Sequence, residues 1–436
     1  MTTTPVAPGR AGGGLLPLET ALERMLDGVE PLPAETVAVE ESLGRIAAEP
    51  LAARLTLPPW DNSAMDGFAV RSDDIADATA ERPVHLRVVG EVAAGRVPER
   101  GVERGTALRI LTGAIVPAGA DAVVPVEDTD APAGVADLPD SVAIHSAAGP
   151  GAHVRHAGSD LEAGTPLLAP GAEIGPSAIG LLIAAGWARI QVYRRPRLAV
   201  LSTGDELAPS GEALAPGRIH DSNGPTLAAQ ARLAGADVER LGIVPDELEA
   251  VVERLASGIE RAEVVVVSGG VSVGARDVVK AGFERLGRLE VWRVAVQPGK
   301  PLAFARARRQ GTGTALLFGL PGNPVSSFVT FELFVRPVLR RLAGRIDPLG
   351  APTVPARLAE PVRTDPDRRS FVRVAVETDP DRADGWLARP SGGQGSHVLS
   401  ALAAADGLAV VPEGIENLPA GAEVEVRLLD RAERIR

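Results

Sequence analysis

The 436-residue chain has room for about three domains. Its net charge of -12 excludes a broad basic face for nucleic acid or an anionic membrane, but it leaves room for a local anion pocket. The absence of cysteine excludes disulfides, thiolate metal sites and cysteine nucleophiles. Residues 1–14 lack the apolar core of a signal peptide and are expected to form a flexible tail. No apolar stretch is long enough to span a bilayer, so we expect a cytoplasmic protein.

The first half of the chain contains a helical segment and then a β-rich region. Leucines at helical spacing from Leu15 predict a helix that ends before Pro31. Between about Trp60 and Asp160, short β-type runs are separated by Gly, Pro and Asp, which predicts a β-rich insert. These runs are 84–92, 106–111, 121–127 and 141–146.

From Arg197 to about Leu342, predicted strands alternate with predicted helices, which indicates a parallel sheet covered on both faces. Asp246 is expected to cap the helix that reaches about Arg261. After about Gly344 the chain becomes strand-like again, which predicts a small C-terminal β domain. The expected fold class is therefore α/β plus β. The predicted strands of the sheet are 197–201, 237–244, 263–267, 289–296 and 315–318.

Ligands of an open parallel sheet bind outside the carboxyl ends of its strands. Each loop that leaves a predicted strand carries glycine, a hydroxyl, a carboxylate or a rigid Pro-Gly unit, and all of them should lie at one edge of the sheet. A purely structural edge would not need this chemistry in every loop. The five loops are 202–206, 245–247, 268–277, 297–301 and 319–324.

Two features of these loops predict an anion and cation site. The glycine-rich loop 268–274 allows backbone N–H groups to approach an anion, although a tight strand-to-helix turn also explains its glycines. Glu206, Asp246 and Asp277 should converge at neighbouring strand ends, where a hard cation such as Mg²⁺ would relieve their repulsion. Singly, each acid is better explained as a helix cap, a first-turn residue or a solvated side chain, but together they favour a site.

Several segments, in this order, resemble the molybdopterin molybdenumtransferase family, which includes bacterial MoeA and the E domain of gephyrin. The set DNSAMDG (61–67), GGVSVG (269–274) and PGNP (321–324) is highly specific. The resemblance runs from about Leu15 to the C-terminus. The other matching segments are 109–128, 156–164, 202–207, 220–225, 297–304 and 391–397.

The resemblance implies a subunit of four parts. A MogA-like α/β domain is expected to comprise 15–33 and 196–344, and a small connector domain 34–52 and 165–195. A β-rich insert domain is expected at 53–164, and a C-terminal β-barrel domain at 345–436. The resemblance also implies a homodimer whose clefts are shared between subunits, and a contact with the molybdopterin adenylyltransferase.

The implied reaction inserts molybdate into adenylylated molybdopterin and releases AMP, with Mg²⁺ assisting. The acids carried over from the family motifs are Asp66, Asp160, Glu206, Asp246 and Asp277, and Mg²⁺ is assigned to Asp66, Glu206 and Asp277. The family often has lysine where this chain has Arg293 and Gln297, so one positive charge is missing at the oxyanion site. The expected substrate-binding residues are Ser202, Thr203, Gly204, Ser268, Gly269, Gly270, Ser272, Gly274, Arg293, Lys300, Pro321, Gly322, Asn323 and Pro324.

Three other functions fit parts of the sequence. A molybdopterin adenylyltransferase uses the same α/β domain but needs neither the insert nor the C-terminal domain. A scaffold protein usually has a long linker and a fused second domain, and this chain has neither. An inactive domain of this fold would not need the intact set of acids.

Overall fold

A computed structural model describes residues 15–132, 137–270, 278–311, 313–382 and 385–429. The expected tail 1–14 and the predicted site residues Ser272, Gly274 and Asp277 lie outside the described residues. Within those ranges, no helix is both long and apolar enough to cross a membrane.

The α/β part is built on a six-stranded sheet with the order β15-β12-β16-β20-β19-β17. The first four strands are parallel, as expected, and β19 and β17 extend the sheet with antiparallel pairings. The strand β19 (Pro301–Arg308) was not predicted from the sequence. The other strands are β15 (Asp237–Val244), β12 (Arg197–Thr203), β16 (Val264–Ser268), β20 (Thr314–Leu320) and β17 (Arg288–Arg293).

Alternate residues of the central strands enter two separate cores, one on each face of the sheet. Leu198 and Val200 of β12 pack on the side of α1, α3, α6 and α7, whereas Ala199 and Leu201 pack on the side of α4 and α5. This double burial explains the nearly continuous apolar runs of the strands. The helices are α1 (Leu18–Leu26), α3 (Asn223–Leu233), α4 (Leu248–Arg261), α5 (Val278–Leu286), α6 (Pro324–Thr330) and α7 (Arg336–Leu342), with a π-helical turn at Phe331–Val335 joining the last two.

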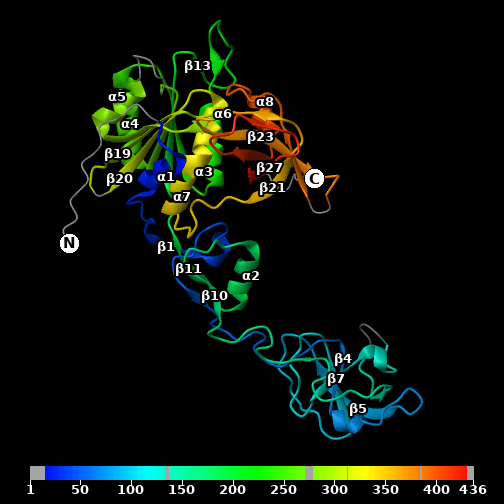
Figure 1. Cartoon of the computed structure of the whole chain (residues 1–436). Helices are drawn as coiled ribbons and strands as arrows, with labels where there is room; N and C mark the ends of the chain where they lie inside the picture. Colours follow the sequence, from blue (N-terminus) through cyan, green and yellow to red (C-terminus); the bar gives the residue numbers. More distant parts are fainter. Residues whose placement is uncertain (1–14, 133–136, 271–277, 312, 383–384, 430–436) are drawn as a thin grey trace, which may run out of the picture.

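The insert contains a five-stranded sheet with the order β7-β4-β6-β5-β8. All four predicted runs form strands, and Gly67–Val70 adds β4 at the second position of the sheet. Figure 1 shows this sheet at the far end of the molecule from the α/β part, with the connector strands β1, β10 and β11 and helix α2 between them. The remaining insert strands are β5 (Val84–Val92), β6 (Thr106–Ile110), β7 (Ala122–Pro125) and β8 (Ser141–Ile144).

The connector is held together by short antiparallel pairs around its own small core. The strand β1 (Ala34–Ala38) pairs with β11 (Arg189–Tyr193), and β2 (Leu51–Ala52) pairs with β10 (Pro166–Leu168). Helix α2 (Pro176–Ala184) contributes Leu182 to the core that these strands cover.

The C-terminal strands close into a barrel. The order is β23-β24-β21-β27-β25, and an additional antiparallel pairing of β25 with β23 closes the ring. Closure leaves no free edge within the ring, which stabilises a small β domain. The barrel strands are β21 (Thr353–Leu358), β23 (Arg369–Thr378), β24 (Trp386–Pro390), β25 (Gly407–Val411) and β27 (Glu423–Leu428).

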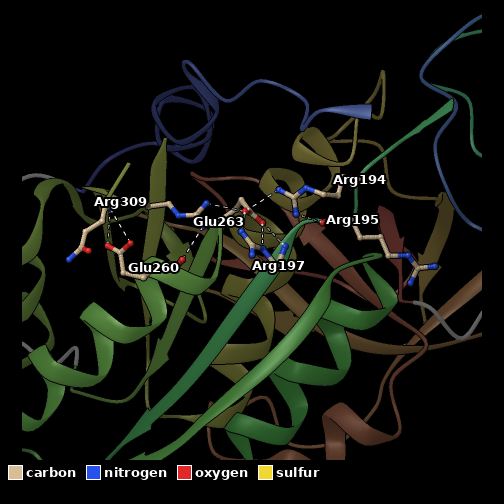
Figure 2. Close-up of polar contacts among 7 residues, drawn as sticks. Arg194, Arg195, Arg197, Glu260, Glu263 and Arg309 are labelled. Atoms are coloured by element: carbon tan, nitrogen blue, oxygen red, sulfur yellow. Dashed lines mark hydrogen bonds and ion pairs between the residues drawn. The ribbon is translucent and has the colours of Figure 1, made fainter. Parts of the chain in front are cut away.

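A buried carboxylate joins the strand starts at the opposite edge of the α/β sheet (Figure 2). Glu263, 5% exposed, directly precedes β16 and accepts hydrogen bonds from the Arg197 backbone N–H at 2.8 Å and the Arg197 guanidinium at 2.7 Å. Arg194 and Arg309 donate to the same carboxylate at 3.1 Å and 3.0 Å. Burial raises the pKa of Glu263, but the hydrogen bonds from Arg197 and Arg194 outweigh burial and lower it to about 2.

We expect Glu263→Gln to destabilise the fold near neutral pH by about 3 kcal/mol, because each lost pKa unit corresponds to about 1.4 kcal/mol. The folded-state pKa is lower than the ordinary value of 4.5, so this stabilisation is present above pH 4.5 and is lost as the pH falls towards about 2. Denaturant unfolding at a series of pH values measures it. Glu253→Gln, an exposed change on α4, is the matched control. Equal unfolding free energies for the two variants at pH 7 would contradict the prediction.

Candidate functional site

The loops that leave the strands of the α/β sheet meet at one edge, as the sequence predicts. Two antiparallel steps separate β17 from β20, so β17 runs parallel to β20 and its following loop reaches the same edge. A cavity of about 660 Å³ lies there. Of the predicted site residues, those that line it are Thr203, Glu206, Asp246, Ser268, Gly269, Gly270, Pro321, Gly322, Asn323 and Pro324.

A hydrogen-bonded link between two neighbouring loops fixes the acidic wall of the cavity. The Thr203 hydroxyl donates to Asp246 Oδ1 at 2.5 Å, and the Asp246 backbone N–H donates to Asp205 Oδ1 at 3.2 Å. The expectation that Asp246 caps the following helix is therefore wrong. Glu247 occupies the N-cap position of α4 without a side-chain cap, and the Asp246 carboxylate is held by Thr203 instead.

Gly204 makes room for Glu206. A β-carbon at Gly204 would lie 2.7 Å and 2.8 Å from the two carboxylate oxygens of Glu206, and the backbone there has a φ of +157°. Gly204 therefore shapes the loop around the carboxylate, although it is not among the described lining residues of the cavity.

A buried acid that was not predicted from the sequence, Asp221, also lines the cavity. Asp221 is 4% exposed and accepts hydrogen bonds from the Ser202 hydroxyl at 3.0 Å and the Gly224 backbone N–H at 2.8 Å. Arg240 lies 3.4 Å from the same carboxylate. The Ser202 hydroxyl thus holds the loop that carries Asp221. Of the predicted pair Ser202 and Thr203, Thr203 is among the lining residues of the cavity and Ser202 is not.

Asn223 connects the loops after β16 and β20 and was also missed. Its amide donates to Ser268 Oγ at 2.8 Å and to the Gly322 carbonyl at 2.7 Å. The two loops approach closely: the Gly269 backbone N–H donates to the Leu320 carbonyl at 3.2 Å, and a β-carbon at Gly322 would lie 3.7 Å from the Gly269 Cα. Asn223 belongs to 220–225, one of the segments that resemble the family, but the sequence analysis predicted no site residue in that segment.

We expect Asn223→Ala to lower the free energy of unfolding by about 1–2 kcal/mol, because two hydrogen bonds between loops are lost. The same change should raise KM for the substrate that binds in this cavity, since the loops that line the cavity separate. Chemical denaturation and steady-state kinetics measure these effects. Asn417→Ala, at an exposed position of the barrel, is the control. Unchanged stability and unchanged KM would show that the loops do not depend on Asn223.

The loop after β17 brings fewer charges to the cavity than expected. Pro301 lines the cavity, but neither Arg293 nor Lys300 is among its lining residues in the described part of the chain. Lys300 is exposed; together with Arg368, whose hydrogen bond is the larger cause, it lowers the pKa of Asp365. Gln297 Oε1 accepts hydrogen bonds from the Asp365 backbone N–H at 3.2 Å and the Ser370 hydroxyl at 3.3 Å, so it ties this loop to the barrel.

Among the described residues of the C-terminal domain, His397 lines the cavity. Its loop is held by Arg373, which is 1% exposed and donates to the carbonyls of Gly393 at 3.0 Å and Gly395 at 3.2 Å. Burial lowers the pKa of Arg373. The Ser396 carbonyl accepts a hydrogen bond from the Val325 backbone N–H at 3.1 Å, which joins the loop to α6.

The insert carries the other two predicted acids, Asp66 and Asp160, both exposed. Thr112 donates to Asp66 Oδ1 from its backbone N–H at 2.6 Å and from its hydroxyl at 2.8 Å. These hydrogen bonds lower the pKa of Asp66, so the carboxylate is charged and fixed in direction. Asp61 and His156 lie 3.1 Å apart, so the segments that contain Asp66 and Asp160 are neighbours.

Within one chain, the predicted acids that the structure describes therefore fall into two groups. Glu206 and Asp246 line the cavity of the α/β part, whereas Asp66 lines another cavity, of about 320 Å³, in the insert. Among the residues that the structure describes, no group of three His, Cys, Asp or Glu side chains could hold a metal ion.

Comparison with known proteins decides the family. Three family models match: "MoeA N-terminal region (domain I and II)" at 16–186, "Probable molybdopterin binding domain" at 199–341 and "MoeA C-terminal region (domain IV)" at 355–429. The chain is 40% identical over 400 residues to molybdopterin molybdenumtransferase 2 of Mycobacterium tuberculosis. The aligned region covers 90% of this chain and 94% of that protein. The chain belongs to the molybdopterin molybdenumtransferase family.

Other members of the molybdopterin molybdenumtransferase family support the assignment over the full fold. The Synechococcus elongatus molybdopterin molybdenumtransferase is 37% identical over 425 residues, with 95% of this chain and 100% of that protein covered. The crystal structure of the molybdopterin biosynthesis MoeA protein from Pyrococcus horikosii has a TM-score of 0.77 and 36% identity, and covers 95% of this chain and 99% of that chain. The chain is thus a transferase of molybdenum cofactor biosynthesis with the mixed α/β fold of this family, barrel included.

Proposed function

We propose that this chain inserts molybdate into adenylylated molybdopterin at the strand-end cavity and releases AMP. The observation that carries the proposal is the composition of that cavity. A glycine-rich strand end, Ser268–Gly270, faces an acidic wall made by Glu206 and Asp246, with the rigid turn 321–324 beside them. Family membership supplies the reaction, and the cavity supplies groups suited to a phosphorylated substrate.

The polar groups of the cavity divide into two kinds. Gly269 and Gly270, both with positive φ, bring backbone to the cavity wall; because the Gly269 N–H donates to the Leu320 carbonyl at 3.2 Å, the Gly270 N–H is the candidate donor to an anionic phosphate. Glu206 and Asp246 are exposed carboxylates on the opposite loops. Asn223 and Thr203 position these loops through the hydrogen bonds described above. Attack of an oxygen nucleophile such as water on the phosphoanhydride breaks the bond between its two phosphates, so AMP leaves and the other phosphate stays on the pterin.

The acidic wall fits a magnesium ion. Mg²⁺ prefers oxygen ligands and usually keeps several waters while one or two carboxylates and the substrate phosphates complete its shell. Glu206 and Asp246 provide such a pair on one chain, and Asp277, outside the described residues, stays a predicted ligand. Bound there, the ion would neutralise charge that develops on the phosphates.

AMP release should therefore fall to background after exhaustive chelation and return when Mg²⁺ is added. The reason is that two carboxylates facing a phosphoanhydride repel it unless a cation lies between them. A coupled assay for AMP, with adenylylated molybdopterin and molybdate as substrates, measures the effect. The melting temperature must stay unchanged by the chelator. Full turnover in the chelated protein would exclude this role of the metal.

We further propose a homodimer in which the insert of one subunit completes the cavity of the other. Asp66 and Glu206 line different cavities, and Figure 1 shows the insert, which carries Asp66, far from the α/β part, which carries Glu206; this separation supports the arrangement. The division into α/β, connector, insert and barrel domains at the boundaries predicted from the sequence is part of this proposal. A contact with the molybdopterin adenylyltransferase and a cytoplasmic location stay predictions from the sequence.

A further inference from the structure

A second polar cavity, of about 350 Å³, lies where three parts of the chain meet, away from the strand-end site. Glu173 reaches it from the connector, Arg336 and Arg340 from α7, and Arg427 from the barrel strand β27. In Figure 1, α7 lies above the connector, and the barrel strands β21 and β27 lie beside it. The strand-end cavity shares none of these lining residues within the described ranges.

Positive charge dominates this junction cavity. Its lining residues include four arginines (Arg336, Arg340, Arg345 and Arg427) and two glutamates (Glu173 and Glu332). This local excess of positive side chains contrasts with the net charge of -12 of the whole chain. A cavity whose lining carries more positive than negative groups attracts anions.

Each of the two glutamates forms an ion pair with one of these arginines. Glu173 pairs with Arg345 at 2.7 Å, and Glu332 pairs with Arg336 at 2.8 Å. Glu332 also accepts a hydrogen bond from Gln230 at 2.6 Å. Its carboxylate, 5% exposed, is therefore surrounded by donors from its own helix and from α3.

Arg340 and Arg427 contact backbone carbonyls instead. Arg340 donates to the Gly350 carbonyl, and Arg427 donates to the Glu332 carbonyl at 3.3 Å. Within the described ranges, no carboxylate forms an ion pair with either side chain, although the exposed Asp347 lies close enough to raise the pKa of Arg340. Burial, and after it repulsion from Arg345 and Arg336, lowers the pKa of Arg340 by more than the attraction of Asp347 raises it. Burial also lowers the pKa of Arg427.

We propose that this junction cavity binds a dianionic oxyanion, either free or as the phosphoryl group of a small molecule. Planar guanidinium groups donate paired hydrogen bonds to such oxygens, and Arg340 and Arg427 retain N–H groups for them. The cavity volume accommodates a phosphoryl group with part of its carrier. Because its walls come from the connector, the α/β part and the barrel, the bound anion would link these three parts. The proposal does not depend on the reaction at the strand-end cavity.

Isothermal titration of the full chain with inorganic phosphate, at low salt, tests this proposal. Arg340→Gln should weaken phosphate binding about tenfold or more, since one charge-assisted hydrogen bond and one positive charge are lost. Arg340→Gln also removes a repelled charge, so it should fold. Arg427→Met should have the same effect on binding, and Arg363→Gln, an exposed change of equal charge, should have none.

Two further measurements identify the class of anion that binds and the cavity in which it binds. Titration with molybdate and with AMP distinguishes a free oxyanion from a phosphorylated small molecule. Glu206→Gln should retain the phosphate binding that Arg340→Gln loses, because Glu206 lies in the other cavity. Equal phosphate affinity in the wild type, Arg340→Gln and Arg363→Gln would overturn the proposal. A wild type that binds no phosphate, for instance because carboxylates of a second copy fill the cavity, would overturn it as well.

Discussion

Replacing Glu206 with glutamine should leave the fold intact and lower the rate of molybdate insertion at least about 100-fold, because removal of one metal-directed carboxylate costs several kcal/mol of transition-state stabilisation. Asp66→Asn should have a similar effect. Both substitutions keep the size and hydrogen-bonding shape of the side chain while removing its charge. AMP release with saturating substrates measures the rate, and thermal unfolding checks the fold.

The control for Glu206→Gln is Glu247→Gln. Glu247 is exposed, lies next to Asp246, and is not among the cavity-lining residues that the structure describes. The Glu247→Gln variant should release AMP at nearly the wild-type rate. If Glu206→Gln and Asp66→Asn both turned over like Glu247→Gln, with unchanged melting temperatures, neither carboxylate would take part in the reaction.

The elements with strong local signals were predictable from the sequence. The β-rich insert was found because Gly, Pro and Asp bound its apolar runs, and β5 (Val84–Val92) was predicted with both ends correct. The positions of the strand-end loops followed from the alternation of strands and helices. That is why ten of the predicted site residues line one cavity.

Features that depend on tertiary contacts were not predictable in this way. β19 has the sequence PLAFARAR, and its alanines and arginines carry little strand preference, so pairing with β17 and β20 decides its conformation. Aspartate is a common helix-capping residue, which is why Asp246 was predicted as a cap, but its carboxylate accepts a hydrogen bond from the Thr203 hydroxyl at the neighbouring strand end. Asp221 and Asn223 act through partners distant in sequence, such as Gly322, which no local pattern reveals.

Mixing the two inactive variants should restore activity, and this is the sharpest test of a cavity shared between subunits. In a dimer that contains one Asp66→Asn chain and one Glu206→Gln chain, both changes fall in the same shared site, and the second site is intact. Equal amounts of the two variants at full exchange give half heterodimers, each with one working site of two. The mixture should therefore regain about one quarter of the wild-type rate, by counting the sites of a closed two-fold dimer.

The mixture must be compared with each variant alone, incubated in the same way, since neither should exceed about one hundredth of the wild-type rate. Exchange itself is followed by mass measurement of dimers in which one variant carries a heavy-isotope label. A mixture of Glu206→Gln with Asp246→Asn is the matched negative control, because both residues line the same cavity of one chain. Such a heterodimer has one damaged residue in each site, so it should stay inactive. If exchange is complete and the Asp66→Asn mixture also stays inactive, each chain carries its own complete site, and Asp66 must act there by approaching Glu206 within one subunit.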